Sequence, residues 1–298
     1  MAARARSLIT ALLFAVTAAI GVTGCEATPP ATPQTAQRIV SLVPTVTEML
    51  FAVGAGPQVV GVSSYDHFPS EVERLPKVGA LIDPDNERIL ALRPDLVVVY
   101  GSQSDSEARF KTAAIQTFSY RHDTAKAIAG TLDLIVAIGT LTGHEAQARE
   151  VVTTMTRDLD AVRARVAGRA RPRTLLVMAR QPGTLRGLYV SGGVGFLHEM
   201  LEVAGGQNVF EDAKRESVQP SSETLLARAP EAVLELYGYG DPAARGTDIG
   251  VWTTLASIPA VRESRVQVLS GDHVVVAGPR LAQGAQAMAR ALHPDAYR

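Results

Sequence analysis

Aromatic and ionisable side chains that could hold a ligand follow several short apolar runs of this 298-residue chain. The predicted ligand-binding residues are Tyr65, His67, Tyr100, Tyr189, Asp272 and His273. Most of them come at or just after the end of a run that is typical of a buried strand, and ligands of open α/β sheets bind outside the carboxyl ends of strands. A single tyrosine at such a place is more often a half-buried anchor with a wet hydroxyl. Because these groups come from both halves of the chain, they favour a ligand cleft between two lobes.

No familiar catalytic or metal-binding motif accompanies these residues. The chain has no G-x-S-x-G elbow, no Walker A loop and no H-E-x-x-H pair. Its six histidines, at positions 67, 122, 144, 198, 273 and 293, do not have metal-ligand spacing. We therefore expect a binding protein with no catalytic residue and no metal site of its own. The alternative is an exported enzyme that uses Asp66, His67 and Asp272 for acid–base chemistry.

The glycine-rich segment Ser191–Gly195 ("SGGVG") could be a phosphate-binding loop. It lacks the Lys-Ser/Thr that would follow in such a loop. A turn and N-cap leading into the helical pattern "FLHEMLEVAG" is the better interpretation.

The elements that must position these residues alternate between short apolar runs and helical patterns from Arg38 onward. Most of the runs are bounded by Gly or Pro and are apolar throughout, as are strands buried on both faces of a parallel sheet. The predicted strands are Ile39–Leu42, Val59–Val62, Leu96–Tyr100, Thr117–Tyr120, Thr174–Met178, Ala232–Leu236 and Val266–Leu269. Thr45 and Glu48 match a capping box, and Asp83-Pro84 matches a cap followed by a first-turn proline. The pattern predicts the α/β class.

One unit of the chain occurs twice. The segment Glu87–Val99, "ERILALRPDLVVV", nearly recurs at Glu223–Glu235 as "ETLLARAPEAVLE", with a proline seven residues after each glutamate. The repeat predicts two related α/β lobes. We place the N-terminal lobe at residues 38–143 and the C-terminal lobe at residues 169–298.

A long amphipathic pattern separates the two lobes. From His144 to Val166, apolar residues recur at spacings of three and four, with charged residues between them. A helix of this length would measure about 35 Å. We expect one bridging helix at residues 144–168, which permits only small opening and closing motions because it contains no glycine-rich hinge.

The N-terminus is typical of a targeting segment. Arg4 and Arg6 precede the uncharged apolar run Leu8–Ile20, which is too short to span a bilayer comfortably. Residues 1–24 end in Val-Thr-Gly before Cys25, the only cysteine of the chain. The segment resembles a bacterial lipoprotein signal, which implies cleavage before Cys25 and lipidation of that residue. An ordinary secretory signal is the alternative, and residues 25–37 are predicted to form an extended Pro/Thr/Ala tether.

The overall charge excludes one class of partner. The net charge is −1 and no Lys/Arg cluster is present, so nothing in the sequence predicts nucleic-acid binding. With 46% hydrophobic residues the chain can build substantial cores. We expect it to work as an exported monomer.

The sequence between Arg38 and the C-terminus resembles a family of periplasmic binding proteins that serve iron-siderophore, haem and cobalamin importers. The resemblance rests on "RIVSLVPTVTEMLFAVGAGPQVVGVSSYDHFP" and "LPKVGALIDPDNERILALRPDLVVVYG". It is closest to the cobalamin (vitamin B12)-binding members, through "GVSSYDHFP", "VSGG", "VFED", "SSETLLARAP" and "GDHVVVAGPR". The resemblance implies two Rossmann-like lobes joined by one long helix (a class III substrate-binding protein) that deliver a large metal-containing ligand to a permease dimer with its ATPase.

The resemblance also assigns roles to individual residues. In this family one surface glutamate on each lobe engages arginines of the permease, and the matching positions are Glu87 and Glu223. Tyr65, Tyr100, Tyr189 and Asp272 fall at positions that match cobalamin contacts.

The pocket predicted in this way departs from the cobalamin-binding pattern. Leu81 and Ser217 stand where that pattern has tryptophan, and the only tryptophan, Trp252, lies elsewhere. A related corrinoid, haem or a ferric siderophore is therefore an alternative ligand. For iron, Tyr65, Tyr100, Tyr189, His67 or His273 could serve as the ligand, because phenolate and imidazole both suit iron.

Overall fold

The computed structural model describes residues 35–80, 83–101, 104–121, 127–238 and 248–298, all within one compact unit. The predicted signal segment with Cys25, and the positions Leu81 and His122, lie outside the described residues. Within those ranges, no helix combines the length and the apolar composition that crossing a bilayer requires.

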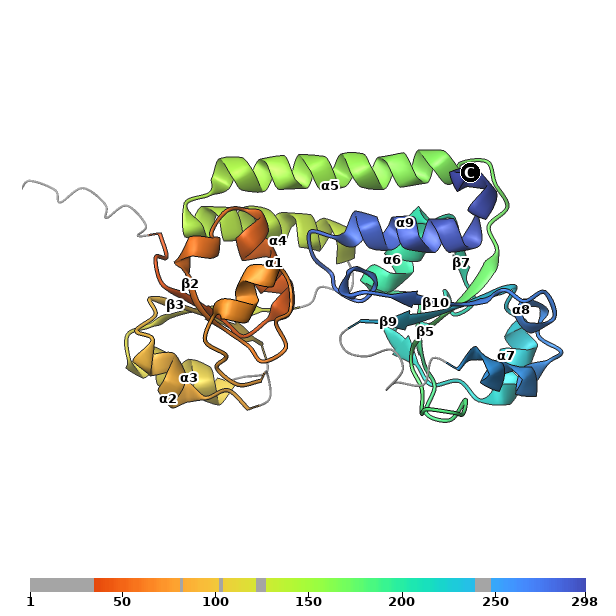
Figure 1. Ribbon diagram of the computed structural model, residues 1–298, viewed down its shortest axis with the longest axis horizontal. Helices are drawn as coiled ribbons and strands as arrows, with labels where there is room; N and C mark the ends of the chain where they lie inside the picture. The colour runs from red at the N-terminus through yellow and green to blue at the C-terminus, as the bar shows by residue number, and fades with distance from the viewer. Residues whose placement is uncertain (1–34, 81–82, 102–103, 122–126, 239–247) are drawn as a thin grey trace, which may run out of the picture. The chain divides into compact units, whose positions relative to one another are not determined.

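The N-terminal lobe is built on one parallel sheet covered by helices (Figure 1). Its strands run in the order β2-β1-β3-β4, and all neighbouring pairs are parallel. The elements are β1 (Ile39–Ser41), α1 (Pro44–Ala52), β2 (Val59–Val62), α2 (Asn86–Ala91), β3 (Leu96–Tyr100), α3 (Ser104–Thr112), β4 (Gln116–Tyr120) and α4 (Ala127–Thr142). The four predicted strands of this lobe are confirmed, and the central strands β1 and β3 are buried, as their apolar composition indicates.

The C-terminal lobe has a six-stranded sheet with a parallel centre and an antiparallel edge. The strand order is β10-β9-β5-β6-β8, with β7 also paired to β5. The elements are β5 (Arg173–Ala179), β6 (Tyr189–Ser191), α6 (Phe196–Val203), β7 (Gln207–Asn208), β8 (Ser217–Val218), α7 (Ser222–Arg228), β9 (Ala232–Tyr237), α8 (Pro259–Arg262), β10 (Val266–Ser270) and α9 (Leu281–Leu292). The parallel strands β5, β9 and β10 were predicted, whereas the antiparallel strands β6 and β8 were not. Strands of two or three residues are too short to carry a recognisable period.

The predicted bridging helix is confirmed as α5 (Glu145–Val166). It packs against α4 of the N-terminal lobe and against α6 and α9 of the C-terminal lobe. Figure 1 shows α5 running above α4 and α9. The residues that it buries toward both lobes form one stripe: Ala148, Met155, Leu159, Val162 and Val166. The two lobes therefore share one stiff element along their length.

Both predicted helix caps are wrong. Helix α1 begins at Pro44, its N-cap is Val43, and no side chain caps it. Glu48 is instead buried, with 3% of its surface exposed, and forms an ion pair with Arg280 of the other lobe. Helix α2 begins at Asn86, after the cap Asp85, because Pro84 pairs with Gly79 in an isolated bridge before the helix starts.

The repeated unit has the same construction in both lobes. A side-chain oxygen caps each helix, from Asp85 before α2 and from Ser221 before α7. Glu87 and Glu223 then lie exposed in the first turn. A carboxylate is stabilised there by the positive end of the helix dipole.

Candidate ligand-binding site

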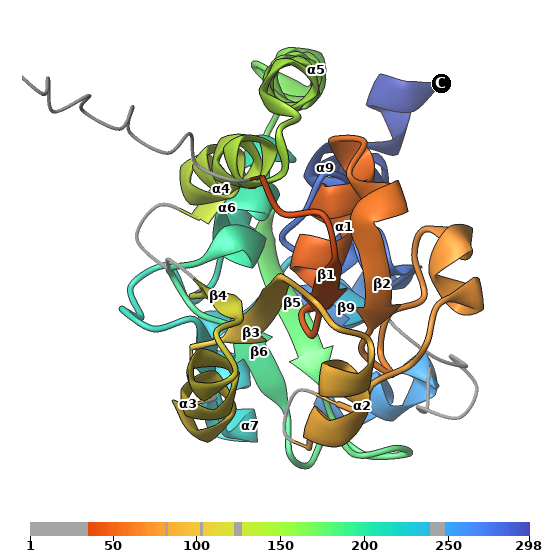
Figure 2. The ribbon, with the colours of Figure 1, turned by 90° about the vertical axis from the view of Figure 1, so that its left-hand side faces the viewer.

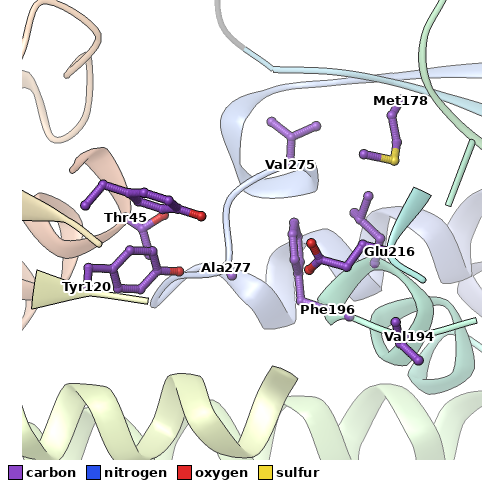
Figure 3. A pocket seen from close by; sticks show the side chains of 11 residues that line it. Thr45, Tyr120, Met178, Val194, Phe196, Glu216, Val275 and Ala277 are labelled. Carbon is purple, nitrogen blue, oxygen red and sulfur yellow. The ribbon is translucent and has the colours of Figure 1, made fainter. Parts of the chain in front are cut away.

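A cavity of about 230 Å³ lies between the strand ends of the two lobes. Figure 3 shows the side chains that line it, with Thr45 and Tyr120 of the N-terminal lobe facing Phe196 and Glu216 of the C-terminal lobe. The lining residues are Thr45, Tyr100, Tyr120, Met178, Val194, Gly195, Phe196, Leu197, Glu216, Val275 and Ala277. Most of these side chains are apolar or aromatic, as in sites that bind organic ligands.

Two tyrosines form the N-terminal wall of the cavity. Tyr100 and Tyr120 end the neighbouring parallel strands β3 and β4 and are partners in the strand register. Their ring centroids lie 5.7 Å apart at an interplanar angle of 58°, a tilted aromatic pair. Burial raises the pKa of Tyr120 to about 12, and the nearby Tyr100 and Glu216 add to the effect. The Tyr120 hydroxyl therefore stays protonated at ordinary pH and keeps its O–H group as a hydrogen-bond donor.

The start of α6 forms the C-terminal wall, after a tight glycine turn. Gly195, the N-cap of α6, has a φ of 92°, a left-handed conformation that favours glycine. A Cβ atom on Gly192 would collide with the Arg215 carbonyl oxygen. The Gly192 N–H donates to the carbonyl of Glu216 at 2.8 Å. The turn thus brings the segment that carries Glu216 beside the start of α6, and Ser191–Gly195 forms the predicted turn and N-cap.

Glu216 is the one charged side chain among the eleven residues that line the cavity. Its carboxylate lies near enough to Tyr120 to help raise the pKa of that phenol. A charged oxygen in a mostly apolar cavity fixes the orientation of a ligand that offers a hydrogen-bond donor.

An ion pair connects the two lobes beside the cavity. Arg280 Nη2 lies 2.6 Å from Glu48 Oε1, and Arg280 Nε lies 3.0 Å from Glu48 Oε2. The Arg280 guanidinium also lies 3.7 Å from the centroid of the Phe68 ring, and its Nη2 lies 3.8 Å from Asp272 Oδ2. Burial raises the pKa of Glu48, although Arg280 opposes this rise. The paired guanidinium and carboxylate tie α1 to the N-terminus of α9.

Of the six predicted ligand-binding residues, Tyr100 is among the residues that line this cavity. Tyr65 and Tyr189 are 54% and 43% exposed, so their rings are open to a ligand from outside. Tyr189 is the strand partner of Ala179, and Ala179 directly follows Met178, which lines the cavity. The roles of Tyr65 and Tyr189 stay predictions.

The other three predicted residues lie near charged neighbours. Asp272 lies beside Arg280, and His67 Nδ1 lies 3.3 Å from Glu73 Oε1. The pKa of His273 is lowered by burial and by the charge of Arg280. A neutral His273 at ordinary pH follows from this shift.

The acid–base residues of the enzyme alternative are held by different neighbours. Asp66 is buried and its Oδ2 accepts a hydrogen bond from Ser63 at 2.6 Å, while burial raises its pKa. His67 lies against Glu73, and Asp272 lies against Arg280. Within the described part of the chain, no group of three or more His, Cys, Asp or Glu residues could hold a metal ion.

Several cavity residues were missed by sequence reasoning. Tyr120 and Met178 end strands that were predicted, so the rule that pointed to Tyr100 could have found both. Phe196 and Glu216 reach the cavity through the glycine turn and the short strand β8, which have no clear sequence signal.

The single tryptophan belongs to a buried polar network of the C-terminal lobe. Trp252 Nε1 donates to Glu235 Oε1 at 2.6 Å, and Arg180 Nε donates to the same oxygen at 2.8 Å. The Tyr237 hydroxyl donates to Glu235 Oε2 at 2.9 Å. Trp252 is 1% exposed, so it acts in the core of this lobe.

Proteins of known name share much of this sequence. A 31% identical relative over 259 residues is the vitamin B12-binding protein of Salmonella typhimurium, with 86% of this chain and 90% of the relative covered. An ABC transporter substrate-binding lipoprotein of Bacillus subtilis, YvrC, is 29% identical over 269 residues, which cover 88% of this chain and 82% of that protein.

The fold was compared with solved structures in the same way. The apo form of the periplasmic heme-binding protein RhuT from Roseiflexus sp. RS-1 matches with a TM-score of 0.74 and 25% identity, over 87% of this chain and 99% of RhuT. Two α/β lobes joined by a long helix are the class III architecture, as predicted. The family model described as "Periplasmic binding protein" matches residues 39–272. Together with the Salmonella relative, this match shows that the chain belongs to the periplasmic binding protein family.

Proposed function

We propose that the protein is the substrate-binding lipoprotein of an ABC importer, which captures cobalamin or a related corrinoid between its lobes. The observation that carries this proposal is the cavity in which Tyr100 and Tyr120 oppose Phe196 across the two lobes. Apolar and aromatic walls with few polar groups suit the burial of an organic ligand. The protein would form no covalent bond with the ligand. It would deliver the bound ligand to the permease.

The size of the cavity bears on how a corrinoid would sit. Its volume of about 230 Å³ is below the range of about 300–1,000 Å³ that is common for drug-sized ligands. A corrinoid would therefore be held in part by side chains outside the cavity or after a small opening of the lobes. The exposed rings of Tyr65 and Tyr189 are suited to that outer contact.

Haem or a ferric siderophore is the second candidate ligand. The named function of the Roseiflexus relative favours it, as do the phenols of the cavity. With its pKa raised to about 12, Tyr120 is costly to ionise as a phenolate ligand for iron. Tyr100 is the other phenol of the cavity. Tyr65, Tyr189, His67 and His273 are further candidates outside the lining residues.

The attachment to the membrane follows from the N-terminal sequence. A lone Cys25 after Val-Thr-Gly, and a relative named as a lipoprotein, support cleavage before this residue and its lipidation. The protein would then act as a monomer on the periplasmic side of the envelope. We expect Cys25→Ser to be lost from the membrane fraction or to remain as uncleaved precursor, and normal retention of this variant in fractionated cells would contradict the anchor.

The partner of the protein would be a permease dimer with its ATPase. Glu87 and Glu223 are exposed at equivalent places of the two lobes and are fixed in the first turns of α2 and α7. A carboxylate held in this way can accept a bidentate bond from arginine. Two pseudo-equivalent carboxylates can meet the two halves of a two-fold partner at the same time.

The ligand is tested on protein purified from its native host. An absorbance spectrum identifies a bound corrinoid or haem, and calorimetric titration with cyanocobalamin, haemin and a ferric hydroxamate compares the classes. We expect one equivalent of cyanocobalamin to bind more tightly than the others. Tighter binding of haemin would establish the second candidate, and turnover of an exported small substrate without stoichiometric uptake would establish the enzyme alternative.

A further inference from the structure

Each of the two helices that carry a docking glutamate also exposes a leucine. Leu90 on α2 is 40% exposed, and Leu226 on α7 is 42% exposed. Each leucine follows its glutamate, Glu87 or Glu223, by three residues. Side chains three apart on a helix are neighbours on its surface. Each helix therefore presents a carboxylate and an apolar side chain side by side.

The exposed leucines are not the core residues of their helices. The preceding residues, Ile89 and Leu225, are 0% and 1% exposed and supply the packing of α2 and α7 against their lobes. One helical step of about 100° carries the next side chain away from that face. Ile89 and Leu225 pack the two helices against their lobes. The exposed parts of the Leu90 and Leu226 side chains can therefore contact another molecule.

The two exposed leucines are informative because they occupy equivalent positions in the two lobes. A single exposed leucine is ordinary on a protein surface. Here both leucines lie at the same place of a repeated unit, 136 positions apart, as the two glutamates do. The residue between glutamate and buried position differs, being Arg88 in one copy and Thr224 in the other. The shared features are thus the exposed acid, the buried aliphatic residue and the exposed leucine.

Both helices lie on the same side of the described fold. In Figures 1 and 2, α2 and α7 lie below the sheets, on the side opposite to α5. A single flat partner could contact both helices together. We call Glu87 with Leu90 the α2 patch, and Glu223 with Leu226 the α7 patch.

We propose that Leu90 and Leu226 are the apolar anchors of the docking surface, and that each enters a hollow beside an arginine on one half of a two-fold membrane permease. This inference rests on the proposed function, since it takes the permease as the occupant. Charge complementarity supports that occupant, because the patches offer acids. A hydrogen bond from Ser221 lowers the pKa of Glu223, which keeps this acid charged.

The two parts of each patch contribute in different ways. An exposed carboxylate–arginine pair adds little affinity and is screened by salt, although it steers the approach of the partner. Burying an apolar side chain adds more, and salt does not screen it. The leucines would hold the complex together, and the glutamates would set its orientation.

The test measures binding to the organism's permease–ATPase complex in lipid nanodiscs by surface plasmon resonance, at low and high salt. Leu90→Ser and Leu226→Ser should each weaken binding roughly tenfold, and the double variant roughly a hundredfold. The loss should be the same at both salt concentrations. Leu90→Met and Leu226→Met are the matched controls, because methionine keeps the apolar surface, and they should bind like wild type.

The glutamate variants separate this inference from the proposed docking. Glu87→Gln with Glu223→Gln should weaken binding at low salt and much less at high salt. If this variant loses binding while the double serine variant stays within twofold of wild type, the leucine anchors are refuted and the docking stands. If wild type does not bind, both are refuted. Thermal unfolding and ligand titration should be unchanged in all variants, since exposed positions rarely affect stability.

Discussion

The two lobes share one construction near helices α2 and α7 and differ near the cavity. In the N-terminal lobe, the Asp95 carboxylate accepts the backbone N–H of Arg38 at 3.0 Å, and the Arg38 guanidinium donates to the carbonyl of Leu92 at 2.7 Å. In the C-terminal lobe, Glu231 accepts the backbone N–H of Arg173 at 2.9 Å. These bonds tie the start of the first strand of each lobe to the segment that leads from α2 into β3, or from α7 into β9.

The C-terminal lobe repeats the second bond as well. Arg173 Nη2 donates to the carbonyl of Arg228, the last residue of α7, at 2.6 Å. In both lobes the chain then passes through a left-handed residue, Arg93 with a φ of 48° and Ala229 with a φ of 45°. The same turn therefore leads from α2 into β3 and from α7 into β9.

The two lobes differ on the side that faces the cavity. Eight of the eleven lining residues come from the C-terminal lobe and three from the N-terminal lobe. The antiparallel strands β6 and β8, absent among the described residues of the N-terminal lobe, hold the turn that carries Glu216. The faces that carry α2 and α7 are therefore built alike in the two lobes, whereas the faces that line the cavity are not.

The largest expected effect is on the free energy of unfolding, at Glu235, a position that differs between the equivalent strands β3 and β9. Glu235 of β9 corresponds to Val99 of β3, and the side chains of Glu235 and Arg180 are both 0% exposed. Glu235→Val would leave Arg180 charged and buried without its carboxylate partner, so we expect the free energy of unfolding to fall by about 3–5 kcal/mol in urea titrations. Arg180→Met added to Glu235→Val should restore much of the loss. A single variant as stable as wild type would show that the network does not stabilise this lobe.

The walls of the cavity allow a direct comparison of the lobes. Tyr100→Ala and Phe196→Ala should each weaken ligand binding by about 1–3 kcal/mol, or roughly five- to a hundredfold in Kd. Tyr65→Ala and Tyr189→Ala, whose rings lie outside the lining residues, should have smaller effects. Calorimetry with cyanocobalamin measures all four, and equal affinity in every variant would move the ligand away from this cavity.

The pH dependence of stability tests the raised pKa of Glu48. Burial raises this pKa above its ordinary value of 4.5, so the folded state holds a proton that the unfolded state releases. This contribution favours folding below pH 4.5 and is lost as the pH rises through the pKa in the folded protein. Glu48→Gln should therefore flatten the fall in unfolding free energy above pH 4.5, leaving a smaller fall from Asp66, whose pKa is also raised. A pH profile parallel to that of wild type would contradict the assignment.

The smallest expected effect is on the pKa of Tyr120, from the charge of Glu216 on the opposite wall of the cavity. The Glu216 carboxylate of the C-terminal lobe helps to raise the pKa of Tyr120, because a nearby negative charge disfavours the phenolate. Glu216→Gln should lower this pKa from about 12, by less than the part due to burial. Ultraviolet titration follows the phenol, and Tyr120→Phe identifies its signal. An unchanged titration in Glu216→Gln would place the carboxylate too far away to act.

The central strands were predictable because their physical signal is local. Apolar runs such as Leu96–Tyr100 are buried on both faces, so composition alone marks them. The same holds for α5, whose single buried stripe recurs with the helical period. Strands β6 and β8 have two or three residues, and their place in the sheet depends on partners far along the chain.

The site was predictable only where it follows the ends of those strands. Tyr100 was found because it ends a predicted strand, and Tyr120 obeys the same rule. Glu216 lies on a surface segment, where a charged residue is unremarkable in sequence. Glu48 was misread because its spacing from Thr45 fits a cap, although its neighbours "MLFA" are apolar and indicate burial. Its partner stands 232 positions away, beyond any local pattern.

That separation has a consequence for how the chain reaches its native state. Arg280, the partner of the buried Glu48, stands 232 positions after it, so α1 cannot bury its carboxylate with this charge partner until the start of α9 contacts the N-terminal lobe. Helix α9 also packs against α5, which contacts both lobes. The packing of the N-terminal lobe is therefore completed by a segment of the C-terminal lobe. We expect the two lobes to unfold together in one cooperative transition.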